Sequence, residues 1–366
     1  MNERAAFDPG SVPPCVASPP GPGSGVARLV LSHVSERSVL HNPNVAGLQP
    51  FTVAGRKRLA TCSGVAWFRG HHLAVVNLYG GHLRVYRFHP GSDGPATGPR
   101  LELLHEMTDG LAYPEDVAVS PDGTLLAVTH SMSDDLGVSL HPIDAVSLAP
   151  GPAGGTLRRG VRGSAFHGVS FSPDSRHLAF TEIGAPGYVE VVTVGMTRER
   201  TCLLENRHAP LKPKSVAFSR DGRFAVIALA LNVAPGPGAA APDGLLSVHR
   251  FDAASGVIGE VVAEMRGPDT ALVNMEICTF LPNISGAPYR VLVANQGADM
   301  VTEFTFDPGA RALAFTGIFA AGLSFPHGVD ACADGRFVAV TTYGDDTLHV
   351  ARVSPGRVAA GGRPTA

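Results

Sequence analysis

The stretch 120–129, which reads SPDGTLLAVT, decides the fold of this 366-residue chain. Related phrases begin at Ser172 (SPDSRHLAFT), Ser219 (SRDGRFAVIA) and Ala333 (ADGRFVAVT). Each phrase places a turn built on aspartate between two apolar runs, and this arrangement is typical of a β-hairpin. Repetition at this scale predicts an array of one supersecondary unit.

Six copies of the unit are visible when their first strands are aligned on one apolar residue each. These anchors are Val65, Val117, Val169, Val216, Cys278 and Val329. They lie roughly 50 residues apart, and most units hold a second hairpin, as in 81–88 followed by 100–106. Four short strands in about 50 residues make a propeller blade. The sequence therefore predicts an all-β fold, a β-propeller with six or seven four-stranded blades.

The ends of the ring must pair, because an open sheet edge frays. The last unit supplies three strands, so we expect its fourth from the N-terminal side, such as residues 57–61. Residues 27–53 are then left over, and they form extra strands or a degenerate seventh blade. We expect a disordered Pro/Gly-rich arm over 1–25, a single propeller domain over 26–356 and a flexible tail over 357–366.

Composition narrows the classes of function. A formal charge of −3 and a pI near 6.6 lack the basic excess that nucleic-acid binding requires. No apolar run reaches the roughly 18 residues of a membrane-spanning helix, and the first 25 residues lack the apolar core of a signal peptide. Five cysteines without a CxxC motif indicate reduced thiols. We therefore expect a cytoplasmic protein that binds a small molecule, without nucleic-acid or membrane partners.

Ionisable residues stand where the innermost strands begin. The residue two places before each anchor faces one mouth of the central channel in this alignment. These positions are Ser63, Glu115, His167, Lys214, Glu276 and His327. Five of the six are ionisable, and such a cluster is costly to remove from water unless it is paired, hydrated or used. The sequence predicts the functional site at this mouth.

Reflecting each position through its hairpin turn predicts cross-strand partners. Glu115 is expected opposite His130, and His167 opposite Glu182. The other expected pairs are Ser63 with Asn77, Lys214 with Leu229, Glu276 with Asn295, and His327 with Thr342. A glutamate directly opposite a histidine can hold its tautomer and raise its basicity. Such pairs serve general acid–base catalysis, or the ligand shells of a metal.

The repeated phrases resemble those of bacterial propellers of the YVTN and SPDG type, and more loosely those of lactonase-like propellers of the gluconolactonase and phosphogluconolactonase types. The resemblance extends over about 63–353 and rests on structural motifs. The lactonase-like resemblance implies hydrolysis of a lactone or related ester, with water activated by an imidazole or a divalent metal. Gluconolactonase-type propellers hold their metal with Glu, Asn and Asp, and no Asp stands at a ring position here.

These observations assign a hypothetical role to each residue. His167 with Glu182, and His130 with Glu115, are expected to be catalytic. Substrate binding is expected from Lys214, Asn77 and His327, and a divalent metal from Glu276 and Asn295.

Three alternatives stay open at this point. The same residues suit proton abstraction beside a carbonyl, so a lyase, isomerase or cyclase is the second enzymatic hypothesis. A non-catalytic scaffold for protein interaction is the third class of function. Propeller channels are also commonly wet, and paired Glu and His side chains can simply satisfy one another around ordered water.

Overall fold

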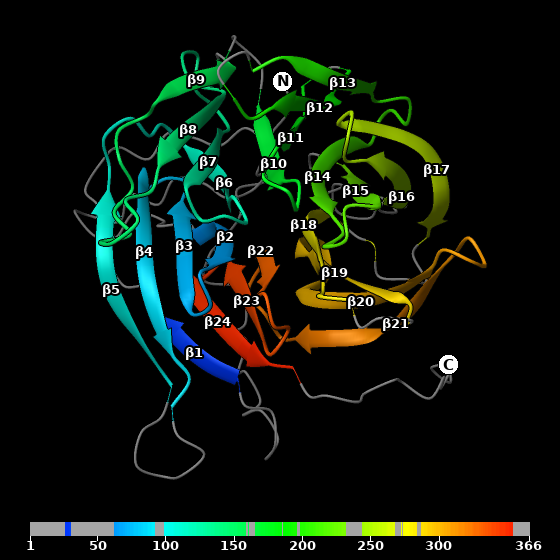
Figure 1. Ribbon diagram of the computed structural model, residues 1–366. Coiled ribbons are helices and arrows are strands. Elements are labelled where there is room, and N and C mark those ends of the chain that lie inside the picture. Colours follow the sequence, from blue (N-terminus) through cyan, green and yellow to red (C-terminus); the bar gives the residue numbers. More distant parts are fainter. Residues whose placement is uncertain are drawn as a thin grey trace, which may run out of the picture.

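The protein is a ring of six four-stranded antiparallel sheets around a central axis (Figure 1). This computed structural model describes residues 26–30, 62–91, 99–158, 160, 165–184, 186–195, 198–231, 244–267, 272, 274–283 and 287–353. The expected all-β propeller is confirmed, with six blades and no seventh sheet in these ranges. The expected arm over 1–25 and tail over 357–366 lie outside them.

Each of the first five blades uses four consecutive strands, numbered from the axis outward. Blade 1 contains β2 (Cys62–Phe68), β3 (His72–Asn77), β4 (His82–His89) and β5 (Arg100–Met107). Blade 2 contains β6 (Pro114–Val119), β7 (Leu125–His130), β8 (Val138–Pro142) and β9 (Gly155–Arg158). Blade 3 contains β10 (Phe166–Phe171), β11 (His177–Glu182), β12 (Tyr188–Thr193) and β13 (Arg200–Glu205).

The second half of the ring repeats this order. Blade 4 contains β14 (Lys212–Phe218), β15 (Phe224–Ala230), β16 (Leu245–Asp252) and β17 (Val257–Arg266). Blade 5 contains β18 (Met275–Phe280), β19 (Tyr289–Asn295), β20 (Met300–Asp307) and β21 (Ala312–Ala321). A 3₁₀ turn, η2 (Gln296–Ala298), follows β19. In the part of the chain that the structure describes, no helix is long and apolar enough to cross a membrane.

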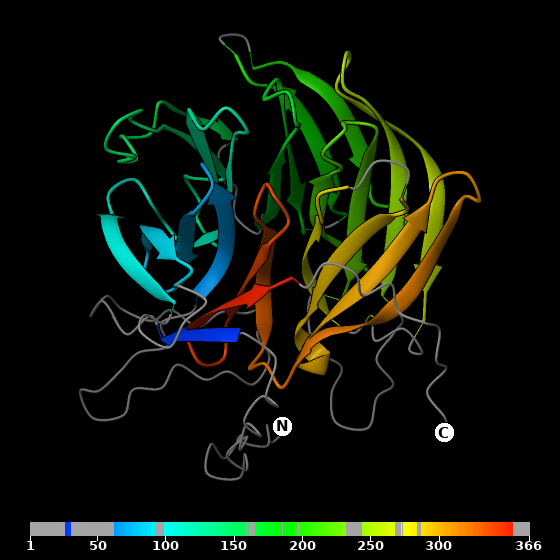
Figure 2. The same ribbon diagram turned by 60° about the horizontal axis from the view of Figure 1, so that its bottom comes forward.

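Blade 6 closes the ring with a strand from the other end of the chain. It contains β22 (Pro326–Ala331), β23 (Phe337–Thr342), β24 (Thr347–Arg352) and β1 (Val26–Val30). β1 runs antiparallel to β24, with Val26 opposite Ala351 (Figures 1 and 2). The expectation that 57–61 supplies this strand is therefore wrong. Closure across the termini is confirmed, but two apolar stretches could fill the free edge of β24, and their residues alone do not rank them.

The apolar core lies in six wedges between neighbouring blades. The wedge between blades 4 and 5, for example, contains Phe224, Phe304 and Phe306, all fully buried. The Leu-Ala-Val runs of the repeated phrase form the second strand of a blade, whose two faces serve different wedges. Leu126 packs toward blade 1 and Ala127 toward blade 3. Each blade thus contributes apolar side chains to two wedges.

A β-bulge interrupts each innermost strand at the same place. In blade 3, Phe166 pairs with Glu182 and Val169 with Phe180, so two residues oppose Thr181 alone. The hydroxyl of Thr181 accepts the N–H of Gly168 at 2.8 Å and donates to the carbonyl of Lys214 in blade 4 at 3.2 Å. The threonine that ends the repeated phrase therefore satisfies the bulge and connects two blades.

Thr129 and Thr341 repeat this arrangement in blades 2 and 6. Thr129 accepts the N–H of Asp116 and donates to the carbonyl of His167. Thr341 accepts the N–H of Gly328 and donates to the carbonyl of Ser63. Three of the six blades thus use one threonine for the same two contacts.

In blade 3, Gly168 occupies the second position of the bulge, close to the innermost strand of blade 4. A Cβ atom on Gly168 would lie 2.7 Å from the Cα of Ser215 and 2.8 Å from the carbonyl oxygen of Lys214. Both are backbone atoms, so neither neighbour can turn aside. The small residue sets how closely blades 3 and 4 approach the axis.

Replacing this glycine should loosen the ring. We expect Gly168→Ala to lower the free energy of unfolding by about 2 kcal/mol, since the added methyl overpacks two backbones. The matched control is Gly259→Ala on β17, where the nearest atoms to a Cβ are 3.8 Å away. It should change stability by less than about 0.5 kcal/mol. Chemical denaturation measures both, and equal effects would contradict the close approach.

Candidate functional site

The bulges change the partners of the ring positions. Pro114, not Glu115, stands opposite His130, and Phe166, not His167, stands opposite Glu182. The other ladders shift alike, pairing Cys62 with Asn77, Pro213 with Leu229, Met275 with Asn295, and Pro326 with Thr342. The expected cross-strand pairs are therefore wrong. Reflection through the turn assumed an uninterrupted ladder, and one extra residue in each innermost strand takes the ring residue out of it.

The same bulge brings the ring residues together at the axis. His327 Nε2 lies 3.0 Å from Glu115 Oε1, and His167 Nε2 lies 3.0 Å from Glu276 Oε2. Lys214 Nζ donates to the same Glu276 oxygen at 3.0 Å. Longer contacts of 3.7 Å and 3.8 Å join His167 to Glu115 and His327 to Glu276. We call these five residues, from blades 2 to 6, the axial cluster.

The two histidines of the axial cluster have opposite protonation preferences. Burial and the charge of Lys214 lower the pKa of His167, and its Nδ1 donates to the carbonyl of Lys214 at 2.8 Å. Burial also opposes the cation of His327, but the hydrogen bond that His327 donates to Glu115 and the charge of Glu276 raise its pKa overall. The ring centroids are only 5.3 Å apart. The pKa values of two adjacent imidazoles are therefore shifted in opposite directions.

Both carboxylates of the axial cluster are held ionised although they are buried. Burial alone would raise the pKa of Glu276, but the charge of Lys214 and the hydrogen bond from His167 bring it to about 2. Glu115 behaves alike, because His327 and His167 lower its pKa. All five side chains are nearly sealed from solvent, with residue exposures of 2–4%. Such burial strengthens every charge–charge contact among them.

Tyrosines that the sequence reasoning missed adjoin the cluster. The ring of Tyr343 stacks on His327 with centroids 5.5 Å apart, and Tyr79 lies 6.4 Å from Tyr343. Tyr79 is partly exposed, and burial raises its pKa. Both residues follow the second strand of their blade, in blades 1 and 6. A tyrosine just after the second strand of two blades is a sequence signal for this mouth, but the aligned ring positions lie within strands alone.

Two residues expected to be catalytic point elsewhere. His130 forms two hydrogen bonds with its ring. Its Nδ1 lies 3.0 Å from the carbonyl oxygen of Ala112, and its Nε2 lies 2.8 Å from Ser139 Oγ. Burial lowers its pKa to about 4. Glu182 accepts the backbone N–H groups of Gly184 at 2.8 Å and Ala165 at 3.3 Å. With the cross-strand pairs gone, the assignment of these two residues to the site loses its geometric basis.

Asn77 and Asn295 are likewise engaged near the ends of their strands. Asn77 Oδ1 accepts the N–H of Gly80 at 2.7 Å. Asn295 donates to the carbonyl of Val293 at 3.2 Å and to Thr302. Asn295 Oδ1 has no hydrogen-bond partner among the described residues. The expected metal pair of Glu276 and Asn295 therefore stays a prediction.

A different set of side chains has the spacing of a metal site. Ligand atoms of Glu115, His167 and His327 all lie within 4.8 Å of one another. Their contacts of 3.0 Å and 3.7 Å suit a single ion, because ligands about 2.1 Å from zinc lie roughly 3–4 Å apart. The Nδ1 of His167 is held by a carbonyl, as is usual for a ligand, whereas Nδ1 of His327 has no hydrogen-bond partner among the described residues. The donors fit a divalent ion in kind and spacing.

The rest of the channel opens at the opposite end, between the Asp-Gly turns. This axial cavity of about 410 Å³ is lined by Asp116, Asp330 and Arg220, among others. Asp116 accepts the N–H of Val169 at 3.0 Å, and Asp330 accepts that of Trp67 at 2.7 Å. Burial raises the pKa of Asp116 to about 7. These carboxylates connect innermost strands of neighbouring blades, which share no backbone ladder.

Solved structures with the same architecture include two enzymes. Kuenenia stuttgartiensis hydrazine synthase matches with a TM-score of 0.55 at 15% identity, covering 83% of this chain and 99% of that chain. The periplasmic gluconolactonase of Pseudomonas aeruginosa matches with a TM-score of 0.53 at 21% identity, covering 80% of this chain and 81% of that chain. The chain shares the β-propeller fold with both structures. At these identities the likeness concerns the fold alone. No protein-family model and no curated protein sequence matches the chain.

The raised pKa of Asp116 predicts a pH-dependent stability. The folded state holds this proton up to about pH 7, whereas an ordinary aspartate loses it near 3.8. Folded protein therefore binds more protons between these values, so stability falls as the pH rises through this window. Asp116→Asn removes the titration and keeps an acceptor for Val169. We expect the variant to gain on the wild type from pH 4 to pH 8, measured by urea unfolding.

The control for this measurement is Asp122→Asn in a repeated turn. Burial works against its ionised form, but hydrogen bonds from Ser120 and Thr124 lower the pKa of Asp122 overall. This variant should lose stability relative to the wild type as the pH rises. A flat difference for Asp116→Asn across the window would contradict its protonation in the fold.

Proposed function

We propose that the protein is a small-molecule enzyme whose axial cluster hydrolyses a lactone or a related ester. The observation that supports this most is the split between the two histidines. Neighbouring titratable groups with opposed pKa shifts supply a base and an acid at one pH. A purely structural ion pair needs no such division.

In this mechanism His167 is the general base. Its Nδ1–H is held by a carbonyl, and its Nε2 lies at the centre of the cluster, 3.0 Å from Glu276 Oε2. In our proposal Nε2 exchanges this contact for a water molecule and takes a proton from it. The water oxygen attacks the carbonyl carbon, and the developing oxyanion lies near the ammonium of Lys214. The ring C–O bond then breaks, and His327 gives its proton to the leaving alkoxide. The product is a hydroxy acid.

The carboxylates position these groups. Glu115 holds the cation of His327 at 3.0 Å, and Glu276 orients both His167 and Lys214. Tyr343, stacked on His327, covers the cluster at the mouth. In our proposal a substrate reaches the base when Tyr343 turns aside.

A metal-dependent variant rests on the spacing of Glu115, His167 and His327. A divalent ion held there would act as a Lewis acid on the carbonyl group of the substrate. The three side chains would then be ligands, and Lys214 with Glu276 would remain beside them. Elemental analysis of the purified protein and the effect of a chelator on turnover separate this variant from acid–base hydrolysis.

A lyase or isomerase is the second candidate. The neutral His167 beside the cationic Lys214 also suits removal of a proton next to a carbonyl, with Lys214 facing the resulting enolate. Solvent deuterium then appears in recovered substrate or product at carbon, which hydrolysis does not produce. A non-catalytic scaffold would show neither reaction.

The proposal includes the size of the substrate and the location of the protein. The substrate is a small molecule, because the cluster is enclosed by six blades. We place the protein in the cytoplasm, and the free thiols of Cys62, Cys202, Cys278 and Cys332 support a reducing compartment. Detection in a periplasmic or secreted fraction of the native host would contradict this location.

The deciding experiment is a screen of lactones by pH-stat, with and without divalent ions. We expect Glu115→Gln and His167→Ala each to lower kcat/KM by about 100-fold or more, the usual contribution of an acid–base group. Glu190→Gln is the control, because Glu190 is fully buried and paired with Arg158 and Arg200 but lies away from the axis. It should keep wild-type turnover. Wild-type activity in both cluster variants would exclude the mechanism.

A further inference from the structure

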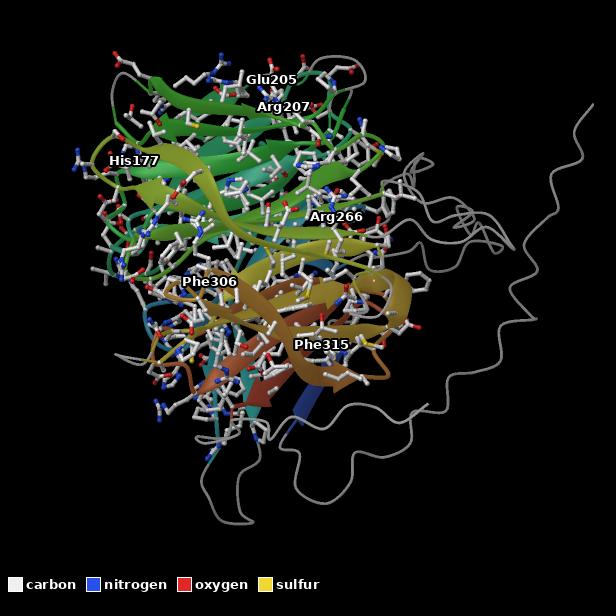
Figure 3. All side chains as sticks on the ribbon, turned by 90° about the vertical axis from the view of Figure 1, so that its right-hand side faces the viewer. His177, Glu205, Arg207, Arg266, Phe306 and Phe315 are labelled. Carbon is white, nitrogen blue, oxygen red and sulfur yellow. The ribbon has the colours of Figure 1, made fainter. Side chains whose placement is uncertain are left out.

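A groove lies between blades 3 and 4. Its volume is about 410 Å³, and apolar side chains such as Leu203, Ile227 and Val261 line it. Figure 3 looks onto this side of the ring and labels Glu205 and Arg207, near the end of β13, and Arg266 at the end of β17. Pockets of this size hold small ligands.

Ser247 and His249, two residues apart on β16, also line this groove. Leu246 and Val248 pack into the wedge toward blade 5, so the alternation of the strand directs Ser247 and His249 toward blade 3. Ser247 Oγ lies 3.0 Å from His249 Nε2. The serine and the imidazole are therefore hydrogen-bonded beside an apolar space.

The backbone sets the tautomer of His249. Its Nδ1 lies 3.3 Å from the carbonyl oxygen of Gly259, which can only accept, so Nδ1 carries the hydrogen. The lone pair of Nε2 is then directed at the Ser247 hydroxyl. Burial lowers the pKa of His249, which keeps the imidazole neutral at neutral pH. A nucleophile, a base and a group that orients the base stand in the order of a catalytic triad.

Blade 2 carries the same Ser-x-His spacing in a sealed form. Ser139 Oγ lies 2.9 Å from His141 Nε2 and 2.8 Å from His130, and Ser139 and His141 are fully buried. Leu148 belongs to the apolar wedge on this side of blade 2. The spacing alone is thus compatible with a structural role. Blade 4 differs because Ser247 and His249, although buried with residue exposures of 4% and 6%, line a groove.

We propose that Ser247 and His249 form a second, independent acyl-transfer site that accepts esters with an apolar acyl group. Ser247 Oγ attacks the ester carbonyl carbon while its proton passes to His249 Nε2. The ester C–O bond breaks, and His249 returns the proton to the leaving alkoxide. Water then attacks the acyl-serine and gives a proton to His249. The bond between the acyl carbon and Ser247 Oγ breaks, His249 returns the proton to Oγ, and the acid is released.

The test is labelling of the full-length protein with a fluorophosphonate probe, followed by mass spectrometry of the modified peptide. We expect the probe on Ser247 of the wild type. Ser247→Ala should abolish labelling, and His249→Gln should lower its rate at least about 100-fold, the usual contribution of a general base. Ser139→Ala is the matched control and should label at the wild-type rate.

Two further results keep this site distinct from the axial cluster. Glu115→Gln should retain labelling of Ser247, even where it abolishes lactone turnover. Thermal unfolding of each variant confirms that it is folded. A wild-type protein that carries no probe, or carries it on another residue, overturns the proposal without reference to any variant, as does undiminished labelling of Ser247 in His249→Gln.

Discussion

The β-bulge in each innermost strand is the constraint on which the axial site depends. In a regular ladder, Glu115 and His167 would stand opposite their cross-strand neighbours, with their side chains between blades. The extra residue moves them out of the ladder, and the ring residues of blades 2 to 6 meet at the axis. The bulge is itself maintained by hydrogen bonds, since Thr181 takes up the N–H of Gly168 that the interrupted ladder leaves over.

The axial cluster is costly to bury, and its contacts show how the cost is offset. Two carboxylates, a lysine and two imidazoles are removed from water, and an unpaired charge there would be strongly destabilising. Each carboxylate accordingly has a cation or an imidazole at 3.0 Å. Buried pairs of this kind are often no more stabilising than apolar residues of similar size. Stability alone therefore does not account for five buried ionisable side chains at one point, and this favours a chemical role.

The repeated turns and apolar anchors predicted the blades because a hairpin is a local structure. They also placed the ring residues correctly along the strands. The register between the first and second strands could not be predicted in this way, since a single extra residue leaves the apolar pattern on both sides intact. His130 and Glu182 were consequently assigned to the axis, although they contact Ser139 and Gly184.

Two other features could not be predicted from the sequence, for different reasons. The closing strand depends on competition between distant segments for one free edge. The tyrosine that stacks on His327 belongs to a loop, whose course no periodic pattern records.

The repeat also explains why a second site could arise in blade 4. The middle of each third strand carries a polar side chain. These positions are Arg84, Ser139, Glu190, Ser247, Thr302 and His349. Arg84 has a glutamate partner, Glu190 has two arginines, and Thr302 has Asn295, so the position is satisfied within its own surroundings. The packing of the neighbouring blade sets how accessible this polar side chain is.

In blade 2 the neighbouring wedge closes over the serine and histidine, whereas between blades 3 and 4 the wedge stays open at their counterparts. A polar position that the fold already tolerates thus becomes reactive when the covering side chains are missing. The groove reaches from the outer strands β13 and β17 into this wedge, because Val189, Ile227 and Leu229 belong to the wedge and also line the groove.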